Sequence, residues 1–103
     1  MDTLQTIEKQ IKDNAIILYM KGSPEMPQCG FSARAVQLLS ACGAEFAYVD
    51  ILSNPDIRKT LPHYANWPTF PQLYINGELI GGSDIMMEMY QAGELQTAVD
   101  QAK

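Results

Sequence analysis

Residues 15–32 read AIILYMKGSPEMPQCGFS, and this stretch decides the fold. Its first part, 15–20, is continuously apolar and short, which is typical of a strand buried on both faces of a sheet. Two prolines and a glycine then exclude regular structure in 22–28, so an exposed loop follows the strand. A helix rich in Ala, Leu and Val is predicted next, from Phe31 to Cys42, with a glycine ending it. The stretch therefore places Cys29 between a buried strand and the start of a helix.

The position of Cys29 favours a reactive thiolate. The first turn of a helix has unpaired backbone N–H groups and positive potential, which lower the pKa of a thiol placed there. Lys21, at the end of the preceding strand, adds a positive charge. A dithiol redox motif would have its second cysteine three residues later, where this chain has Ser32. A serine cannot form a disulfide, so Cys29 has three possible uses: a mixed disulfide with an external thiol, a metal or cluster ligand, or a structural role.

The second cysteine of the chain does not supply the missing thiol. An unbroken helix from Cys29 to Cys42 would span roughly 20 Å, whereas a disulfide needs Cα atoms within about 7 Å. We therefore expect Cys42 to be a buried core residue at the end of the helix.

The rest of the chain shows a regular alternation of helical and strand patterns. The predicted elements are a helix capped by Asp2 or Thr3 and ending near Asn14, a strand over 46–51, a helix from Asn54-Pro55 to about Tyr64, a hairpin over 73–80 that turns at Asn76-Gly77, a helix capped by Ser83 or Asp84 and ending at Tyr90, and a last helix ending near Ala102. This order predicts an α/β fold in one domain, residues 1–103, with a four-stranded mixed sheet flanked by helices and an extra N-terminal helix.

Composition narrows the function classes. The net charge of −5, from 7 Lys+Arg against 12 Asp+Glu, makes nucleic acid a poor candidate partner. The N-terminus has no basic region followed by an apolar run, and the longest apolar run is too short to span a bilayer, so we expect neither a signal peptide nor a membrane segment. Two cysteines are few for a small secreted protein. We expect a soluble protein of a reducing compartment, the cytoplasm.

Four spaced motifs together resemble one family. They are Lys21, Cys29-Gly30-Phe31-Ser32, Trp67-Pro68-Thr69-Phe70-Pro71-Gln72 and Gly81-Gly82-Ser83-Asp84. In this order they resemble the monothiol glutaredoxins of the CGFS type, in the short single-domain bacterial form. The resemblance covers nearly the whole chain and implies a thioredoxin-like fold.

The resemblance also implies a glutathione site around the thiol. Pro71 would be in the cis configuration and face Cys29. The backbone of Phe70 would pair with the cysteinyl unit of glutathione, with Thr69 nearby. Trp67, in the same loop, would shape the groove or form part of a partner surface.

Charged residues would hold the two ends of glutathione. The resemblance implies that Lys21 and Arg58 face the glycyl carboxylate, and that Asp84, with the backbone around Ser83, holds the γ-glutamyl end. Glutathione has two carboxylates and one ammonium, so two cations and one carboxylate suit it. One departure is Ser83, where the family often has a cysteine; no disulfide between this position and Cys29 is possible here.

Three functions remain open. The leading hypothesis, implied by the resemblance, is a carrier of a [2Fe–2S] cluster. Cys29 and glutathione of each subunit would hold the cluster at a homodimer interface. The resemblance also implies that the cluster is delivered to apo-proteins and that the protein pairs with BolA-type proteins. The alternative is a glutathione-dependent thiol–disulfide oxidoreductase that removes glutathione from proteins; the family implies that the long loop over 22–28 keeps such activity low. A cluster-free adaptor is the third, and it leaves Lys21, Cys29 and Asp84 unexplained.

Overall fold

The computed structural model describes residues 2–102. Within them the elements are α1 (Thr3–Asp13), β1 (Ile16–Met20), α2 (Gly30–Ala41), β2 (Ala47–Asp50), α3 (Pro55–Ala65), β3 (Gln72–Ile75), β4 (Glu78–Gly81), α4 (Ser83–Gln91) and α5 (Glu94–Asp100). This order of helices and strands is the one predicted from the sequence. None of these helices is long and apolar enough to cross a membrane.

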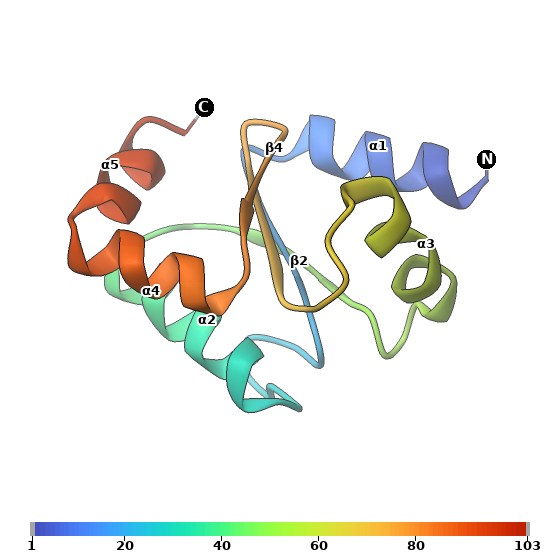
Figure 1. Cartoon of the computed structure of the whole chain (residues 1–103), viewed down its shortest axis with the longest axis horizontal. Helices are drawn as coiled ribbons and strands as arrows, with labels where there is room; N and C mark the ends of the chain where they lie inside the picture. The colour runs from blue at the N-terminus through green and yellow to red at the C-terminus, as the bar shows by residue number, and fades with distance from the viewer. Residues whose placement is uncertain (1, 103) are drawn as a thin grey trace.

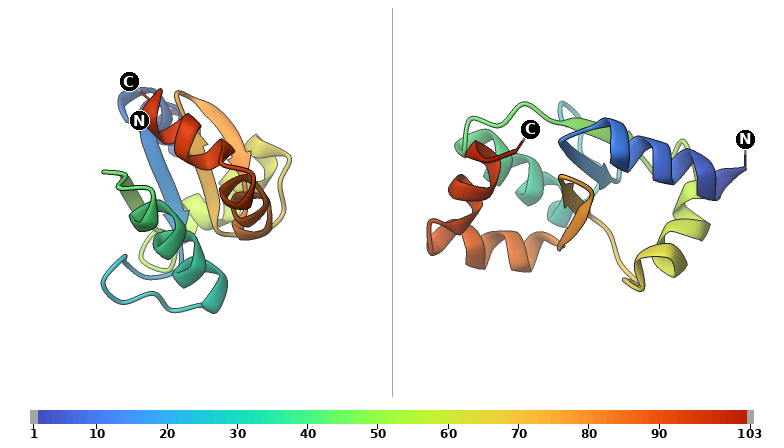
Figure 2. Two further views of the ribbon diagram at one scale, coloured as in Figure 1. Left: turned by 90° about the vertical axis from the view of Figure 1, so that its left-hand side faces the viewer. Right: turned by 90° about the horizontal axis from the view of Figure 1, so that it is seen from above.

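The strands form one mixed sheet, which separates two layers of helices. The strand order is β2-β1-β3-β4; β1 and β2 are parallel, while β3 is antiparallel to both β1 and β4. The helices α1 and α3 lie on one face of the sheet and α2, α4 and α5 on the other (Figures 1 and 2). This is the thioredoxin-like fold, with α1 as the extra N-terminal helix.

The central strand β1 supplies both cores. Ile16, Leu18 and Met20 pack with the buried residues of α2, α4 and α5. Ile17 and Tyr19 pack with those of α1 and α3. Successive side chains of a strand point to opposite faces, so a strand covered on both faces needs apolar residues at every position. Burying each such side chain stabilises the fold by about 1.5–3 kcal/mol, which explains the uninterrupted apolar run.

Several local predictions are confirmed. Asp2 caps α1 by accepting a 2.8 Å hydrogen bond from the N–H of Gln5. The turn at Asn76-Gly77 has positive φ at both residues, 50° and 82°. Cys42 is the C-cap of α2 and is 6% exposed within the core.

One predicted helix cap is wrong, and another is confirmed in position only. The N-cap of α4 is Gly82, whose carbonyl accepts from Met86, and neither Ser83 nor Asp84 caps the helix. The extended backbone at Gly82 lets the helix begin directly after β4, one residue earlier than a side-chain cap would allow. Asn54 is the N-cap of α3 by position, but its side-chain amide donates to the carbonyl of Asp50 at 2.9 Å, so it does not cap the helix with its side chain.

Candidate functional site

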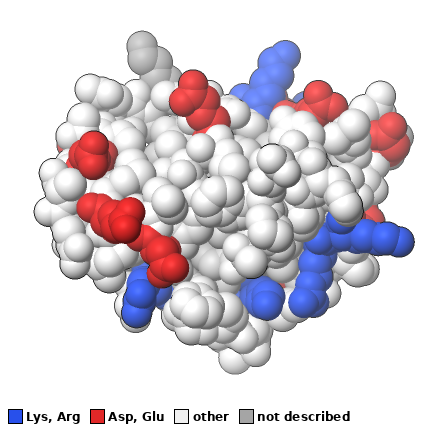
Figure 3. All heavy atoms as spheres, viewed as in Figure 1, with Lys and Arg blue, Asp and Glu red and all other residues white. Residues whose placement is uncertain are grey.

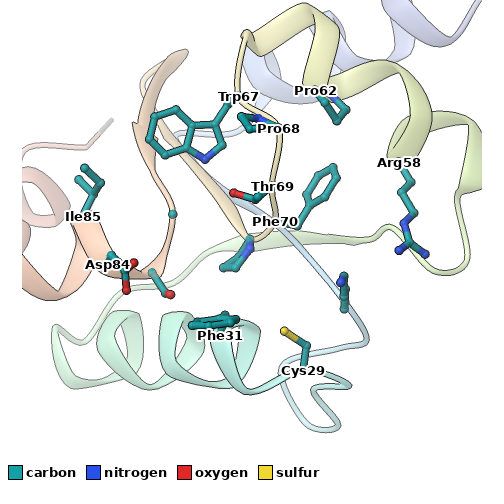
Figure 4. A pocket seen from close by; sticks show the side chains of 14 residues that line it. Cys29, Phe31, Arg58, Pro62, Trp67, Pro68, Thr69, Phe70, Asp84 and Ile85 are labelled. Atoms are coloured by element: carbon teal, nitrogen blue, oxygen red, sulfur yellow. The ribbon is translucent and has the colours of Figure 1, made fainter.

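A cleft of about 560 Å³ opens where the start of α2, the loop before β3 and the start of α4 meet (Figure 4). Every site residue predicted from the sequence lines it: Lys21, Cys29, Arg58, Thr69, Phe70, Pro71, Ser83 and Asp84. The lining also contains Trp67, as expected, and five residues that were not predicted: Phe31, Pro62, Pro68, Gly82 and Ile85.

Cys29 is the N-cap residue of α2. Its backbone is extended, and its carbonyl accepts the first helical hydrogen bond, from Ala33 at 3.0 Å. The thiol is partly exposed, and its sulfur points into the cleft (Figure 4). The helix start therefore presents one thiol to any molecule that enters.

The pKa of the Cys29 thiol lies below its ordinary value. Burial alone would raise this pKa. Hydrogen bonds from the backbone N–H groups of Ser32 and Phe31 and from the Ser32 side chain lower it, as does the positive charge of Lys21, and together they outweigh burial. All of these groups stabilise the thiolate, which is both the nucleophile and the metal ligand.

Ser32 holds the helix start in place. Its side chain is completely buried, and its hydroxyl oxygen accepts a 3.1 Å hydrogen bond from the backbone N–H of Lys21. The sequence identified Ser32 only as the absence of a second cysteine. The structure adds that this hydroxyl ties the end of β1 to the first turn of α2.

The loop between β1 and Cys29 is closed by its own hydrogen bonds. Gln28 donates its N–H to the carbonyl of Lys21 at 2.9 Å, and Ser23 and Met26 exchange backbone bonds of 3.3 and 3.1 Å. Gly22, with φ of 88°, donates its N–H to the carboxylate of Asp50 at 3.0 Å. The loop therefore has a defined shape and anchors on β2.

The opposite wall of the cleft is the segment that leads into β3. The Phe70–Pro71 peptide bond is cis, as the family resemblance implied. Thr69 and Phe70 face the cleft from this wall, above Cys29 (Figure 4). The indole N–H of Trp67 is buried and has no hydrogen-bond partner within the described residues.

Opposite charges lie at the two ends of the cleft. Arg58 comes from α3, Asp84 comes from α4, and Cys29 lies between them (Figure 4). On the face shown in Figure 3, basic side chains lie over α3 and acidic ones over α4 and α5, although acidic side chains also lie toward the α1 and α3 end. The cleft thus suits an elongated ligand with a carboxylate at one end and an ammonium at the other.

Phe31 is the main residue that the sequence analysis missed. It continues the buried stripe of α2, formed by Ala35, Leu38 and Leu39, by one turn toward the helix start. At that point the helix has passed the end of the core, so the ring is 58% exposed and lines the cleft instead. An aromatic residue that extends a buried stripe beyond the last packed turn was the available signal.

The donor set of the cleft is a single thiol. Within residues 2–102 no group of three or more His, Cys, Asp or Glu side chains is close enough to hold a metal ion. A [2Fe–2S] cluster needs four ligands. The residues present therefore fit such a cluster only as a contributor of one thiolate per chain.

Comparisons with known proteins agree with this geometry. The family model described as Glutaredoxin matches residues 16–80. Glutaredoxin 4 of Escherichia coli strain K12 is 67% identical over 97 residues, which cover 94% of this chain and 84% of that protein.

Solved structures of glutaredoxins are also similar. The solution structure of reduced poplar apo GrxS14 has a TM-score of 0.82 and 47% sequence identity, with 95% of this chain and 90% of that chain covered. The crystal structure of the holo form of glutaredoxin C1 from Populus tremula x tremuloides has a TM-score of 0.82 and 27% identity, with 97% and 92% covered. The family model and the 67% identical relative show the family, and the Cys29-Gly30-Phe31-Ser32 motif has a single cysteine. The chain therefore belongs to the glutaredoxin family, as a monothiol member.

Proposed function

We propose that the cleft binds glutathione. Lys21 and Arg58 attract the glycyl carboxylate. Asp84 accepts hydrogen bonds from the γ-glutamyl ammonium, and the backbone around Ser83 helps to hold the same γ-glutamyl end. The charges at the two ends of the cleft support this orientation, because glutathione carries the matching groups at its two ends.

The middle of glutathione would lie along the wall that faces the thiol. The backbone of Phe70 pairs with the cysteinyl unit in this proposal, beside Thr69 and Pro71. These residues line the cleft together with Cys29, which supports a glutathione thiol placed next to the protein thiol.

With glutathione bound, the site would hold a [2Fe–2S] cluster at the interface of a homodimer. Each subunit supplies the Cys29 thiolate and one glutathione thiolate, so two subunits give the four ligands that the cluster needs. Half of the ligands are then small molecules, which favours release of the cluster to apo-proteins. BolA-type proteins are the proposed partners, and the cytoplasm is the proposed location.

One observation carries this proposal. The cleft holds a single thiol with a lowered pKa, and the position of a second cysteine is filled by Ser32, which is buried and hydrogen-bonded to the backbone. The site is thus arranged to keep one thiolate available and to form no disulfide inside the motif. The crystal structure of a related glutaredoxin at 27% identity is of a holo form, which supports a bound group at this site. We propose that the whole chain, residues 1–103, works as one domain.

The experiment is anaerobic reconstitution with iron, sulfide and glutathione, followed by optical spectroscopy and iron and sulfide analysis. The protein should gain the visible absorption of a [2Fe–2S] cluster, and Cys29→Ser should gain none. Cys42→Ala is the matched control, since Cys42 is buried away from the cleft and should not affect loading. Normal iron and sulfide content in Cys29→Ser would contradict the assignment.

The lowered pKa of Cys29 also favours a second candidate, glutathione-dependent removal of glutathione from proteins. The Cys29 thiolate attacks the glutathione sulfur of a mixed disulfide, and the protein thiolate leaves. A second glutathione thiolate then attacks that sulfur, which releases glutathione disulfide and restores Cys29. Release of a glutathionylated peptide's free thiol, measured with and without added glutathione, tests this candidate; a low rate is expected.

A further inference from the structure

A completely buried glutamine lies behind the wall of the cleft. Gln72 begins β3 and has 0% of its surface exposed, although glutamine is mostly a surface residue. Its backbone lies opposite Tyr19 of β1, within the sheet. A buried amide destabilises a fold unless its hydrogen bonds are satisfied. The partners of this amide therefore indicate what it does.

The amide of Gln72 holds the wall of the cleft at two points. Its nitrogen donates to the carbonyl oxygens of Trp67 and Thr69, at 3.0 and 3.2 Å. Both residues line the cleft. Carbonyl oxygens only accept hydrogen bonds, so the nitrogen must face them, and both of its hydrogens are used. One side chain thus fixes the loop of residues 67–70 from the protein interior.

Tyr74 sets the orientation of that amide. Its hydroxyl donates to the side-chain oxygen of Gln72 at 3.0 Å, and Tyr74 is 3% exposed. A flipped amide would turn its oxygen toward two carbonyl oxygens and lose both loop bonds. The Tyr74 ring packs edge-on against Tyr19, with centroids 5.7 Å apart, which keeps the hydroxyl in place.

We propose that Gln72, oriented by Tyr74, is a positioning residue that holds the loop of residues 67–70 in the shape that glutathione binds. The inference rests on the proposed function, because it concerns the same cleft. A backbone group cannot turn independently of its loop, so binding through the Phe70 backbone depends on how firmly the loop is held. The side chain of Gln72 does not line the cleft, so it acts only through the loop.

The test uses the chain's only tryptophan, which lies in this loop. Gln72→Met keeps the length of the side chain but leaves the carbonyls of Trp67 and Thr69 without their donor. Trp67 fluorescence should shift to longer wavelength and become easier to quench with acrylamide. The Kd for glutathione, from titration calorimetry, should rise at least about fivefold, the effect of losing one oriented hydrogen bond. Tyr74→Phe should change both readouts in the same direction, by less.

Tyr19→Phe is the matched control. The Tyr19 hydroxyl also donates to a glutamine side chain, Gln10 of α1, at 2.8 Å, but this pair does not reach the cleft. Tyr19→Phe should lower the Tm about as much as Tyr74→Phe while leaving Trp67 fluorescence and the glutathione Kd unchanged. If Tyr74 only stabilised the fold, the two variants would have the same Trp67 fluorescence and the same glutathione Kd. A difference in these two readouts is expected only if Tyr74 helps to position the loop.

Wild-type fluorescence and wild-type Kd in a folded Gln72→Met protein would overturn the inference. If that variant does not fold, equal Kd and equal quenching in Tyr74→Phe and Tyr19→Phe would overturn it instead. Failure of the wild-type protein to bind glutathione would refute the proposed function, and Trp67 quenching would still decide whether Gln72 holds the loop.

Discussion

The hydroxyl of Ser32 accepts a 3.1 Å hydrogen bond from the backbone N–H of Lys21, at the helix position where a dithiol motif has its second cysteine. The bond joins the end of β1 to the first turn of α2, the two elements that flank the cleft thiol. The residue that prevents a disulfide within the motif therefore also fixes the position of Cys29.

Replacing this serine should change the chemistry of the motif. Ser32→Cys places a second thiol in the first turn of α2, three residues after Cys29, where air oxidation should form an intramolecular disulfide. The change also weakens the hydrogen bond to the Lys21 N–H, which should lower the free energy of unfolding of the reduced protein by about 1 kcal/mol. Mass spectrometry of the oxidised protein detects the disulfide. Three free thiols after air oxidation, with Cys42 counted, would show that the two side chains do not face each other.

The lowered pKa of Cys29 predicts a pH dependence of alkylation. Because the thiolate is the reactive form, the rate of reaction with iodoacetamide should reach its midpoint at a lower pH than for an ordinary cysteine. Ser32→Ala removes one hydrogen bond to the thiolate and should move that midpoint upward. Both proteins should carry Cys42→Ala, so that only Cys29 reacts. An unchanged or lower midpoint in Ser32→Ala would contradict the role assigned to the hydroxyl.

Asp50 should make part of the stability depend on acid pH. The N–H of Gly22 holds the pKa of Asp50 below its usual 3.8; burial acts against this, and bonds from Leu52 and Ser53 add to it. A carboxyl whose pKa is lowered by folding adds stability above its unfolded pKa, and this is lost as the pH falls through the folded pKa. Asp50→Asn should therefore be less stable at neutral pH.

Urea unfolding at pH 7, 5, 4 and 3 measures this contribution. The stability difference between wild type and Asp50→Asn should be constant down to about pH 4, the ordinary range of the carboxyl, and should shrink below it. Glu88→Gln is a suitable control, because Glu88 is an exposed acid of α4 that lies outside both the loop and the cleft. A difference that persists unchanged to pH 3 would mean that the Asp50 charge does not hold the loop.

Asp84 should determine how the amino end of glutathione is held. Asp84→Lys reverses the charge that faces the γ-glutamyl ammonium, and a charge-assisted pair contributes about 1.5–3 kcal/mol. We therefore expect the glutathione Kd to rise about tenfold or more in titration calorimetry. Glu88→Lys makes the same change of net charge one turn later on α4, outside the cleft, and should leave the Kd unchanged. Equal affinities of Asp84→Lys and wild type would remove Asp84 from the site.

Much of the fold follows from the sequence because single residues force local structure. The continuous apolar run of β1 requires a strand covered on both faces, and Asn76-Gly77 supplies the two positive φ angles of the hairpin turn. The caps of α3 and α4 were not predictable in the same way. A side chain that could cap a helix can also bond to other backbone groups nearby, and the amide of Asn54 donates to the carbonyl of Asp50 instead.

The site was predicted only in part for a related reason. Lys21, Cys29 and Asp84 carry charge or a thiol, so their types alone suggest a role. Gln72 and the Ser32 hydroxyl act through bonds to backbone atoms that are distant in sequence, and nothing in the residue type announces those partners. Such contacts appear only once the chain is folded.

The most direct test of the central claim is the composition of the cluster-loaded protein. Ser32 and Ser83 occupy the two nearby positions where a thiol is expected, and Cys42 lies away from the cleft. Two subunits therefore supply only two of the four cluster ligands, and the other two must come from outside the protein. Reconstitution with and without glutathione should be followed by size-exclusion chromatography and thiol analysis of the coloured fraction. We predict a dimer containing glutathione in a one-to-one ratio with Cys29, and colourless monomer when glutathione is omitted. A stable coloured dimer that contains no glutathione or other small thiol would contradict the account.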